Sequence, residues 1–153
     1  MSTFWRISNH IDLEGNGGRL FPTRWSSRGL RIVFLAESPA GAMLEILVHL
    51  PLAKGKLPDA YNLIKVEISE DSSKRSLHPP VGDSWRRDAT RTRRIGDTWL
   101  RSKETALARV PSVILPRTWN WLLNPEHPDA KHARIEEVVR ERFDNRLFRF
   151  GRP

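Results

Sequence analysis

The sequence predicts a single α+β domain that contains more strand than helix. Its 153 residues fit one domain and leave little room for a second. Stretches with the composition of β-strands outnumber stretches with helical periodicity. Strand and helix patterns also fail to alternate in the regular way that builds a doubly wound parallel sheet. An α+β arrangement is therefore favoured over an α/β one.

Three strands and a glycine-rich loop are predicted in the N-terminal half. Residues 4–7 fit a short first strand, and three glycines mark a loop over residues 14–19. Residues 30–36 (LRIVFLA) are rich in branched and aromatic side chains, which is typical of a buried strand. Residues 61–68 (YNLIKVEI) alternate polar and apolar side chains, as a strand with one face in the core does.

A helix is predicted between the last two of these strands, from about Pro39 to Leu50. Ser38 is suited to cap its N-terminus, and Pro39 is suited to its first position because proline lacks the N–H that goes unpaired there. Pro51 is expected to end it. The apolar side of this helix is expected to consist of Met43, Leu44, Leu47 and Val48.

The C-terminal half is predicted to contain one helix and several strands. Residues 69–83 are polar and hold two prolines and a glycine, so they are expected to form a long loop. A helix is predicted over residues 97–108, with Asp97 near its start. Strands are then predicted at residues 110–115, 120–123, 134–140 and 147–150.

The chain is strongly basic, with a formal net charge of +8 that comes mostly from arginine. Residues 84–101 alone hold six arginines against two aspartates, a local net charge of +4. Such a balance favours an acidic partner, which could be a nucleic acid, a phosphorylated small molecule or an acidic protein. For any single arginine, a place on the solvated surface is the simpler explanation.

Several common sites are excluded by the residue types and motifs that the sequence lacks. Without cysteine there is no disulfide, no thiolate metal site and no cysteine nucleophile. The five histidines lack the paired spacing of metal ligands, so no metal site is expected. The phosphate-binding, dinucleotide-binding and zinc-protease motifs and the G-x-S-x-G hydrolase elbow do not occur. With no signal peptide pattern and no long apolar stretch, a cytoplasmic protein that stays out of the membrane is expected.

Residues 23–29 (TRWSSRG) are the best candidate for part of a ligand pocket. They place Arg24, Trp25 and Arg28 beside a glycine, just before the strand that holds Phe34. The guanidinium group can hold a phosphate through two parallel hydrogen bonds. Trp25 is the tryptophan best placed to form a pocket wall.

Two further polar residues, Glu45 and Ser112, stand in apolar surroundings. Glu45 lies at the border of the apolar side of the predicted helix, either solvated at the helix edge or pointing into a cleft, and the pattern alone favours the solvated position. Ser112 lies between Pro111 and Val113, where a hydroxyl is more often a satisfied core group than a catalyst. Pattern alone does not link either residue to Arg24.

At these positions the chain resembles the RES domain, a family named for its arginine, glutamate and serine. The family's arginine falls on Arg24, its glutamate on Glu45 and its serine on Ser112. A family aromatic, usually tyrosine, falls on Phe34, which keeps the ring but lacks the hydroxyl, and Ser26 stands where many relatives have asparagine. The matching stretches follow the family's order and are residues 5–18 (WRISNHIDLEGNGG), 23–34 (TRWSSRGLRIVF), 36–50 (AESPAGAMLEILVHL), 61–68 (YNLIKVEI), 96–100 (GDTWL) and 110–129 (VPSVILPRTWNWLLNPEHPD).

The resemblance implies a fold, an activity and a partner. It implies a compact domain like that of ADP-ribosyltransferases, with mixed β-sheets and a few helices. It implies a toxin of a type II toxin–antitoxin system that consumes NAD as a substrate, by hydrolysis or phosphorolysis, with no cofactor. It further implies an Xre-like helix-turn-helix antitoxin, a toxin homodimer within that complex, and contact with DNA only through the antitoxin.

The resemblance also assigns roles to residues. Glu45 is expected to stabilise the cationic ribosyl transition state, and Arg24 to hold the pyrophosphate or the adjacent ribose. Ser112 is expected to position the nicotinamide ribose or the carboxamide. The residues expected to bind NAD are Arg24, Trp25, Arg28, Phe34, Tyr61 and Ser112, with Phe34 and Tyr61 stacking on the nicotinamide ring.

Three other functions are compatible with parts of the sequence. A protein ADP-ribosyltransferase would share the first bond cleavage and differ only in the acceptor. A nucleic-acid-binding protein would explain the charge, although no helix-turn-helix or RNA-binding signature occurs. An inactive partner-binding module would explain Phe34, but Arg24, Glu45 and Ser112 argue against it.

Overall fold

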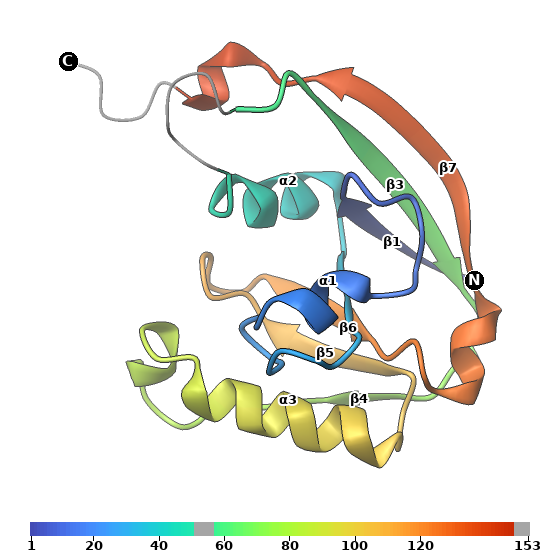
Figure 1. Cartoon of the computed structure of the whole chain (residues 1–153), viewed down its shortest axis with the longest axis vertical. Coiled ribbons are helices and arrows are strands. Elements are labelled where there is room, and N and C mark those ends of the chain that lie inside the picture. The colour runs from blue at the N-terminus through green and yellow to red at the C-terminus, as the bar shows by residue number, and fades with distance from the viewer. Residues whose placement is uncertain (51–56, 149–153) are drawn as a thin grey trace.

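A single curved sheet of seven strands forms the centre of the molecule (Figure 1). The computed structural model describes residues 1–50 and 57–148. The strands lie in the order β4-β5-β6-β2-β1-β3-β7. All neighbours pair antiparallel except β4 and β5, which pair parallel, so the sheet is mixed. The strands are β1 (Ser2–Ile7), β2 (Val33–Ala36), β3 (Ala60–Ile68), β4 (Lys74–Ser76), β5 (Leu107–Pro111), β6 (Trp119–Leu123) and β7 (Ala133–Arg142).

Alternation along the strands gives the sheet two apolar faces. Because neighbouring side chains of a strand point to opposite faces, β2 sends Val33 and Leu35 to one face and Phe34 to the other. The first face is packed around Phe4, Ile64 and Val66. The second face is packed around Trp25, Trp99, Leu100, Ala108, Val110 and Leu122. The candidate site lies on the second face.

Three α-helices and three short 3-10 turns accompany the sheet in the part of the chain that the structure describes. They are α1 (Asn16–Leu20), α2 (Pro39–Leu47), α3 (Thr90–Ser102), η1 (Ser84–Arg86), η2 (Pro128–His132) and η3 (Asn145–Phe148). The expected cap of α2 is confirmed, since the Ser38 hydroxyl accepts a hydrogen bond of 2.9 Å from the Gly41 N–H. α3 covers the second face of the sheet through Trp99 and Leu100.

The helix predicted at residues 97–108 was placed too far along the chain. α3 starts at Thr90 and ends at Ser102, and Lys103 follows with a left-handed φ of 51°. The good helix formers after Lys103 instead enter β5, where Leu107 and Ala108 are buried between β4 and β6. Tertiary burial therefore outweighs local helix propensity here.

The loop predicted at residues 14–19 contains the short helix α1. Gly15 adopts a left-handed φ of 70° at its start. A Cβ atom on Gly18 would lie 2.4 Å from the Leu30 carbonyl oxygen, so only glycine permits this close approach of two backbones. The glycines thus allow packing, where their usual association with loops suggested an irregular segment.

The remaining differences concern the ends of elements. The strand predicted at residues 30–36 is limited to Val33–Ala36, and the one at 110–115 is shifted to Leu107–Pro111. The polar loop at residues 69–83 contains the short strand β4. α2 ends at Leu47, leaving Val48 56% exposed, so Val48 does not belong to an apolar face. Of the strand predicted at residues 147–150, the described part lies in η3, and residues 149–150 lie outside the described chain.

Candidate active site

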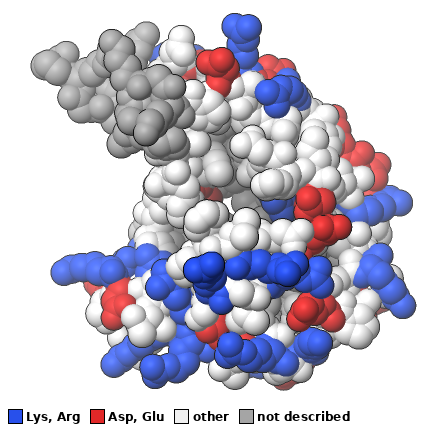
Figure 2. All heavy atoms as spheres, viewed as in Figure 1, with Lys and Arg blue, Asp and Glu red and all other residues white. Residues whose placement is uncertain are grey.

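A cavity of about 350 Å³ opens on the second face of the sheet. Its floor is built by β1, β2, β5 and β6, one side by α2, and the opposite side by residues 22–25. Figure 2 shows the surface hollowed between α2 and the lower half of the molecule. The cavity falls within the range of protein sites that bind small molecules.

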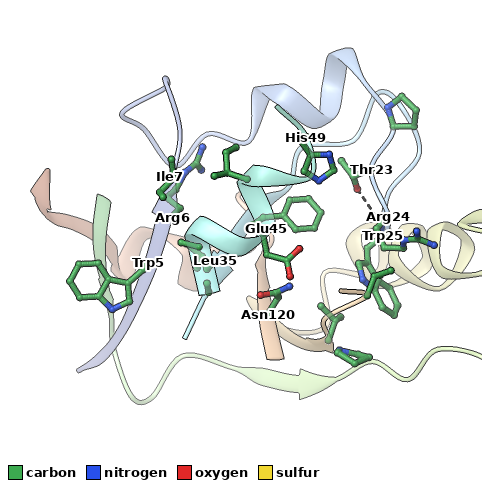
Figure 3. Close-up of a pocket in the computed structure, with 18 residues that line it drawn as sticks. Trp5, Arg6, Ile7, Thr23, Arg24, Trp25, Leu35, Glu45, His49 and Asn120 are labelled. Carbon is green, nitrogen blue, oxygen red and sulfur yellow. Dashed lines mark hydrogen bonds between the residues drawn. The ribbon is translucent and has the colours of Figure 1, made fainter. Parts of the chain in front are cut away.

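One stripe of α2 faces this cavity. Ala42, Glu45 and Ile46 line it, and their spacing of three and four residues places them on one side of the helix. His49, two residues beyond the end of α2, also lines the cavity. Glu45 is therefore directed into the cavity and is not at a solvated helix edge, which the sequence pattern alone favoured (Figure 3).

Ser112 holds the Glu45 carboxylate in place. The Ser112 hydroxyl donates a hydrogen bond of 2.7 Å to Glu45 Oε1 and accepts bonds from the Ile114 and Leu115 N–H groups, at 3.1 and 3.3 Å. Ser112 is 1% exposed and does not line the cavity. This differs from the expectation that Ser112 contacts the substrate, because its hydrogen-bonding capacity is already used on Glu45 and its own loop.

Arg24 lines the cavity but is also tied to the turn η1. Its Nη1 donates to the Trp85 carbonyl at 2.6 Å and its Nη2 to the Arg86 carbonyl at 3.1 Å. A guanidinium carries five N–H donors, so three of them have no partner among residues 1–50 and 57–148 and are available to a ligand. Burial lowers the pKa of Arg24 from its ordinary value, the charge of Arg93 adds to this, and Asp88 opposes it.

Helix α3 fixes the backbone of the Arg24 segment. The Thr92 hydroxyl donates to the Arg24 carbonyl at 2.6 Å, and Asp97 accepts bonds from both the N–H and the hydroxyl of Ser27, at 2.7 and 2.5 Å. A Cβ on Gly96 would come within 1.7 Å of the Trp25 carbonyl oxygen. Residues 96–100, one of the stretches that resemble the RES family, therefore pack against the Arg24 segment and hold it in place.

The two candidate aromatic residues take different positions in the cavity. Trp25 is 2% exposed, so most of its ring belongs to the core, yet it still lines the cavity wall. Phe34 on β2 lines this cavity and also a second groove beside it. At the boundary between the cavity and the groove, Phe34 therefore lacks the hydroxyl that a tyrosine would have.

The structure does not bring Arg28 or Tyr61 to the cavity. Arg28 is exposed and precedes Gly29, whose φ of 104° turns the chain away toward β2. Tyr61 lies near the start of β3, with its ring centroid 4.8 Å from that of Phe143. Neither residue lines the cavity, so neither takes part in the site as this structure shows it.

Arg6 is a candidate residue that the sequence reasoning missed. It lies on β1 and lines both the cavity and the neighbouring groove, and its guanidinium makes no hydrogen bond with the described residues. Burial lowers the pKa of its guanidinium from the ordinary value, and the charge of Asp12 opposes this. A partly buried cation with free donors is suited to an anionic ligand. The available signal was an arginine inside an otherwise apolar strand.

The sequence reasoning also missed Asn120, which is again a polar residue in an otherwise apolar strand. It stands between two tryptophans on β6, is 8% exposed, and lines the cavity near Glu45 (Figure 3). Its Oδ1 accepts no hydrogen bond within residues 1–50 and 57–148. Such an unpaired buried oxygen is rare in folded proteins, and a ligand with a donor group would satisfy it.

The described residues contain no group of three or more metal-ligating side chains arranged to hold an ion. Among the helices described, none is long and apolar enough to cross a membrane.

Comparison with known proteins places this geometry in a family. The chain is 40% identical over 144 residues to Toxin Res of Pseudomonas putida, covering 94% of this chain and 98% of the relative. It is 37% identical over 163 residues to the Prs ADP-ribosylating toxin of Sphingobium sp., covering 97% and 98%. A chain in the crystal structure of the M. tuberculosis MbcT–MbcA toxin–antitoxin complex has the same fold, with a TM-score of 0.70, 18% identity, and coverage of 96% of this chain and 86% of that one.

The family model of the RES domain matches residues 3–145, which is nearly the whole chain. The expected α+β fold with a mixed sheet is confirmed by the topology and by the shared fold of the mycobacterial complex. Two of the three residues for which the family is named line one cavity, and the third is hydrogen-bonded to one of them. The chain belongs to the RES domain family.

Proposed function

We propose that this protein is the toxin of a bacterial toxin–antitoxin pair and that it cleaves NAD between nicotinamide and ribose. The observation that carries the proposal is the Glu45 carboxylate, held by Ser112 and facing a cavity that two arginines also line. The names of the relatives support the toxin role, and one of them is an ADP-ribosylating toxin.

The chemistry needs a fixed negative charge more than it needs a proton donor. When the bond from the ribose C1′ to the nicotinamide nitrogen breaks, its electron pair leaves with nicotinamide, which departs as a neutral molecule. The ribose is left as an oxocarbenium-like cation, as in glycoside cleavage. An acceptor oxygen then bonds to C1′ and loses its proton.

Glu45 is suited to stabilise that cation. One of its oxygens accepts a hydrogen bond from the Ser112 hydroxyl. The other accepts no hydrogen bond from the described residues and lies at the cavity. A preorganised charge needs no reorientation as the transition state forms. Ser112 then acts as a positioning residue for Glu45, and Arg6 and Arg24 supply donors for the pyrophosphate.

The first test is the reaction itself. Purified protein incubated with NAD is expected to release nicotinamide. Free ADP-ribose, ADP-ribose 1″-phosphate made in the presence of phosphate, or ADP-ribosylated protein would identify water, phosphate or protein as the acceptor. Because the Sphingobium relative is named as an ADP-ribosylating toxin, protein is the first acceptor to examine. If no nicotinamide were released under any of these conditions, the proposal would be wrong.

The second test removes the charge of Glu45. Glu45→Gln keeps the size of the side chain and is expected to lower kcat for nicotinamide release by about 100- to 1,000-fold, the usual effect of losing one such electrostatic contact. Glu141→Gln, the same substitution at an exposed position of β7, is the control and should leave kcat unchanged. Equal rates for Glu45→Gln and the parent protein would contradict the role of Glu45.

The basic surface supports a protein antitoxin as the partner. Figure 2 shows Lys and Arg side chains gathered over α1 and α3, below the hollow. Exposed arginines in this region are Arg19, Arg28, Arg91, Arg94 and Arg101. An acidic antitoxin of the Xre-like helix-turn-helix kind would match this charge, and a complex of toxin with antitoxin has been crystallised for the mycobacterial protein of the same fold.

A further inference from the structure

The cavity that holds Glu45 is small for a whole dinucleotide. Its volume of about 350 Å³ lies near the lower end of the range for ligand sites, roughly 300–1,000 Å³. A molecule made of two nucleosides joined by a pyrophosphate therefore has to extend out of this cavity. The direction in which it extends is set by what lies beside the cavity.

A second groove of about 370 Å³ adjoins the cavity. The two spaces share four lining residues, namely Arg6, Ile7, Thr23 and Phe34. They are therefore neighbours along one surface, with the Phe34 ring and the Arg6 guanidinium at the boundary. Of these four shared residues, only Arg6 carries a charge.

The groove is lined by several polar side chains that the cavity does not share. Its own side chains include Ser8, His10, Asp12 and Asn16. Asp12 Oδ1 accepts the Glu14 N–H at 3.0 Å, and Oδ2 accepts no hydrogen bond within the described chain. A carboxylate with a free oxygen is the group that commonly binds the hydroxyls of a nucleoside ribose.

We propose that this groove binds the adenosine half of NAD, with Asp12 accepting from its ribose hydroxyls and Arg6 pairing with the pyrophosphate at the boundary. Nicotinamide riboside then lies in the cavity over Glu45. The inference rests on the proposed function, since it assigns the two halves of the same substrate. It makes the groove the part of the site that distinguishes a dinucleotide from a mononucleotide.

The test compares two substrates that share the bond to be cleaved. NAD contains the adenosine half, and nicotinamide mononucleotide lacks it. Asp12→Asn is expected to lower kcat/KM for NAD by about 10- to 100-fold, the effect of losing a charge-assisted hydrogen bond, and to leave kcat/KM for the mononucleotide unchanged. Asp71→Asn is the matched control, because it makes the same substitution at an exposed residue that lines neither the cavity nor the groove, and it should alter neither value.

Several outcomes would overturn the assignment. Asp12→Asn could leave NAD cleavage intact, or lower cleavage of both substrates equally, or change only the ratio of hydrolysis to transfer. The last result would make the groove an acceptor site. A parent protein that cleaves the mononucleotide as efficiently as NAD would also overturn it.

Binding separates this inference from the proposed function. Calorimetric titration with ADP-ribose measures occupation of the groove without any cleavage, and Asp12→Asn is expected to weaken it by a similar factor. If the parent cleaves neither substrate yet binds ADP-ribose in an Asp12-dependent way, the proposed function fails and the groove assignment stands. If ADP-ribose binding does not depend on Asp12, the groove assignment fails.

Discussion

Asn120 is buried near Glu45 with a side-chain oxygen that accepts no hydrogen bond from the described residues. A buried polar atom left unpaired costs folding free energy, on the order of 1–3 kcal/mol. The cost is understandable if the substrate satisfies that oxygen, for example through the carboxamide NH₂ of nicotinamide. The unpaired oxygen of Asn120 is thus expected to lower the stability of the free protein and to strengthen the binding of substrate.

Replacing Asn120 tests this link. Asn120→Leu is close in size and removes the unpaired oxygen, so the free energy of unfolding is expected to stay the same or rise by about 1 kcal/mol. The same change is expected to lower kcat/KM for NAD about tenfold or more, because the substrate loses a partner. Denaturant unfolding and steady-state kinetics measure the two effects. A variant that is destabilised, or as active as the parent, would contradict the argument.

Phe34 shows what a single-residue departure from the family pattern changes. The ring lies at the boundary of the cavity and the groove, so its stacking surface is kept. The missing hydroxyl removes one donor and acceptor from that boundary. Arg6, which lines both spaces and has free donors, provides polar contacts there instead.

At the scale of elements, the turn η1 connects the two sides of the site. It receives both hydrogen bonds of Arg24 on its carbonyls, and Arg86 Nη1 donates to the Val113 carbonyl at 2.8 Å. Val113 follows Ser112, whose hydroxyl holds Glu45. A short turn with no catalytic group thereby fixes the spacing between the arginine segment and the carboxylate.

Arg86→Ala is expected to disturb this spacing without removing any group that contacts substrate. Since small misplacements of a reacting group cost about 10- to 100-fold in rate, kcat should fall within that range while KM changes little. Arg87→Ala is the matched control, because Arg87 is the next residue, carries the same charge and is exposed. Comparable kinetics of the two variants would show that η1 has no positioning role.

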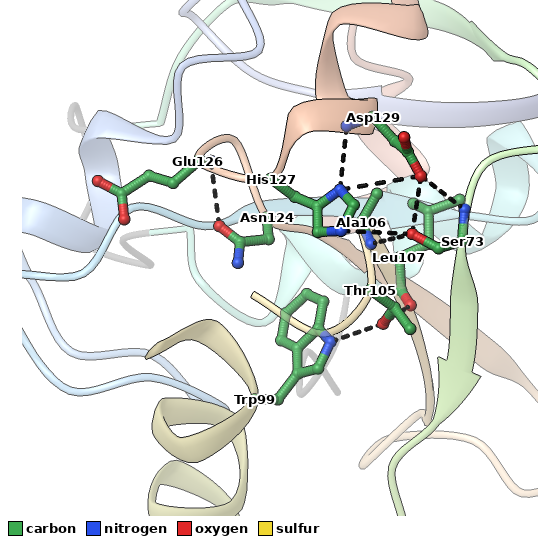
Figure 4. A network of polar contacts seen from close by, with 9 residues as sticks. All are labelled: Ser73, Trp99, Thr105, Ala106, Leu107, Asn124, Glu126, His127 and Asp129. Carbon is green, nitrogen blue, oxygen red and sulfur yellow. Dashed lines mark hydrogen bonds and ion pairs between the residues drawn. The ribbon is translucent and has the colours of Figure 1, made fainter. Parts of the chain in front are cut away.

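In the molecule as a whole, a partly buried polar network joins segments that are far apart in sequence (Figure 4). Asp129 Oδ2 accepts the Ser73 N–H at 3.1 Å and the Ser73 hydroxyl at 2.8 Å. The same hydroxyl accepts the Ala106 N–H at 3.0 Å. The network ties the start of β4 to η2 and β5. Its serine, histidine and aspartate do not form a catalytic triad, because Ser73 donates to the aspartate and His127 Nδ1 accepts the Asp129 N–H.

This network predicts a dependence of stability on pH. Hydrogen bonds from the Ser73 N–H and then from its hydroxyl lower the pKa of Asp129 from its ordinary value. A carboxyl group with a lowered pKa in the folded state stabilises that state fully above the unfolded pKa, and this contribution is lost as the pH falls through the folded pKa. Asp129→Asn should therefore lower Tm at pH 7, and the difference from the parent should shrink toward pH 3.

Thermal unfolding of both proteins between pH 3 and pH 7 measures this difference. Asp71→Asn is the control, since the Asp71 side chain is exposed and forms no hydrogen bond among the described residues. A Tm difference that is constant over the whole pH range would rule out the stated electrostatic origin.

The elements that were predicted well are those whose pattern is local. β3 alternates buried and partly buried side chains, in line with the alternation of YNLIKVEI, and the capped start of α2 is encoded in Ser38 and Pro39. α3 was misplaced because the residues after Lys103 favour helix locally but are buried as a strand. The site residues Arg24 and Glu45 were identified through the resemblance, whereas Arg6 and Asn120 were not. A polar residue in an apolar strand can be assigned to a cavity only when the neighbouring strands and helices are in place.

The amino-acid sequence is enough to predict the class of fold, the basic charge and the start of α2, and its resemblance to the RES family identifies the arginine, glutamate and serine of the site. The packed structure is needed to see that Glu45 faces a cavity, that Ser112 acts through Glu45, and that Arg28 and Tyr61 lie elsewhere. Periodicity and capping act over a few residues, whereas the direction of a side chain and the partners of its polar atoms depend on which distant segments pack against it.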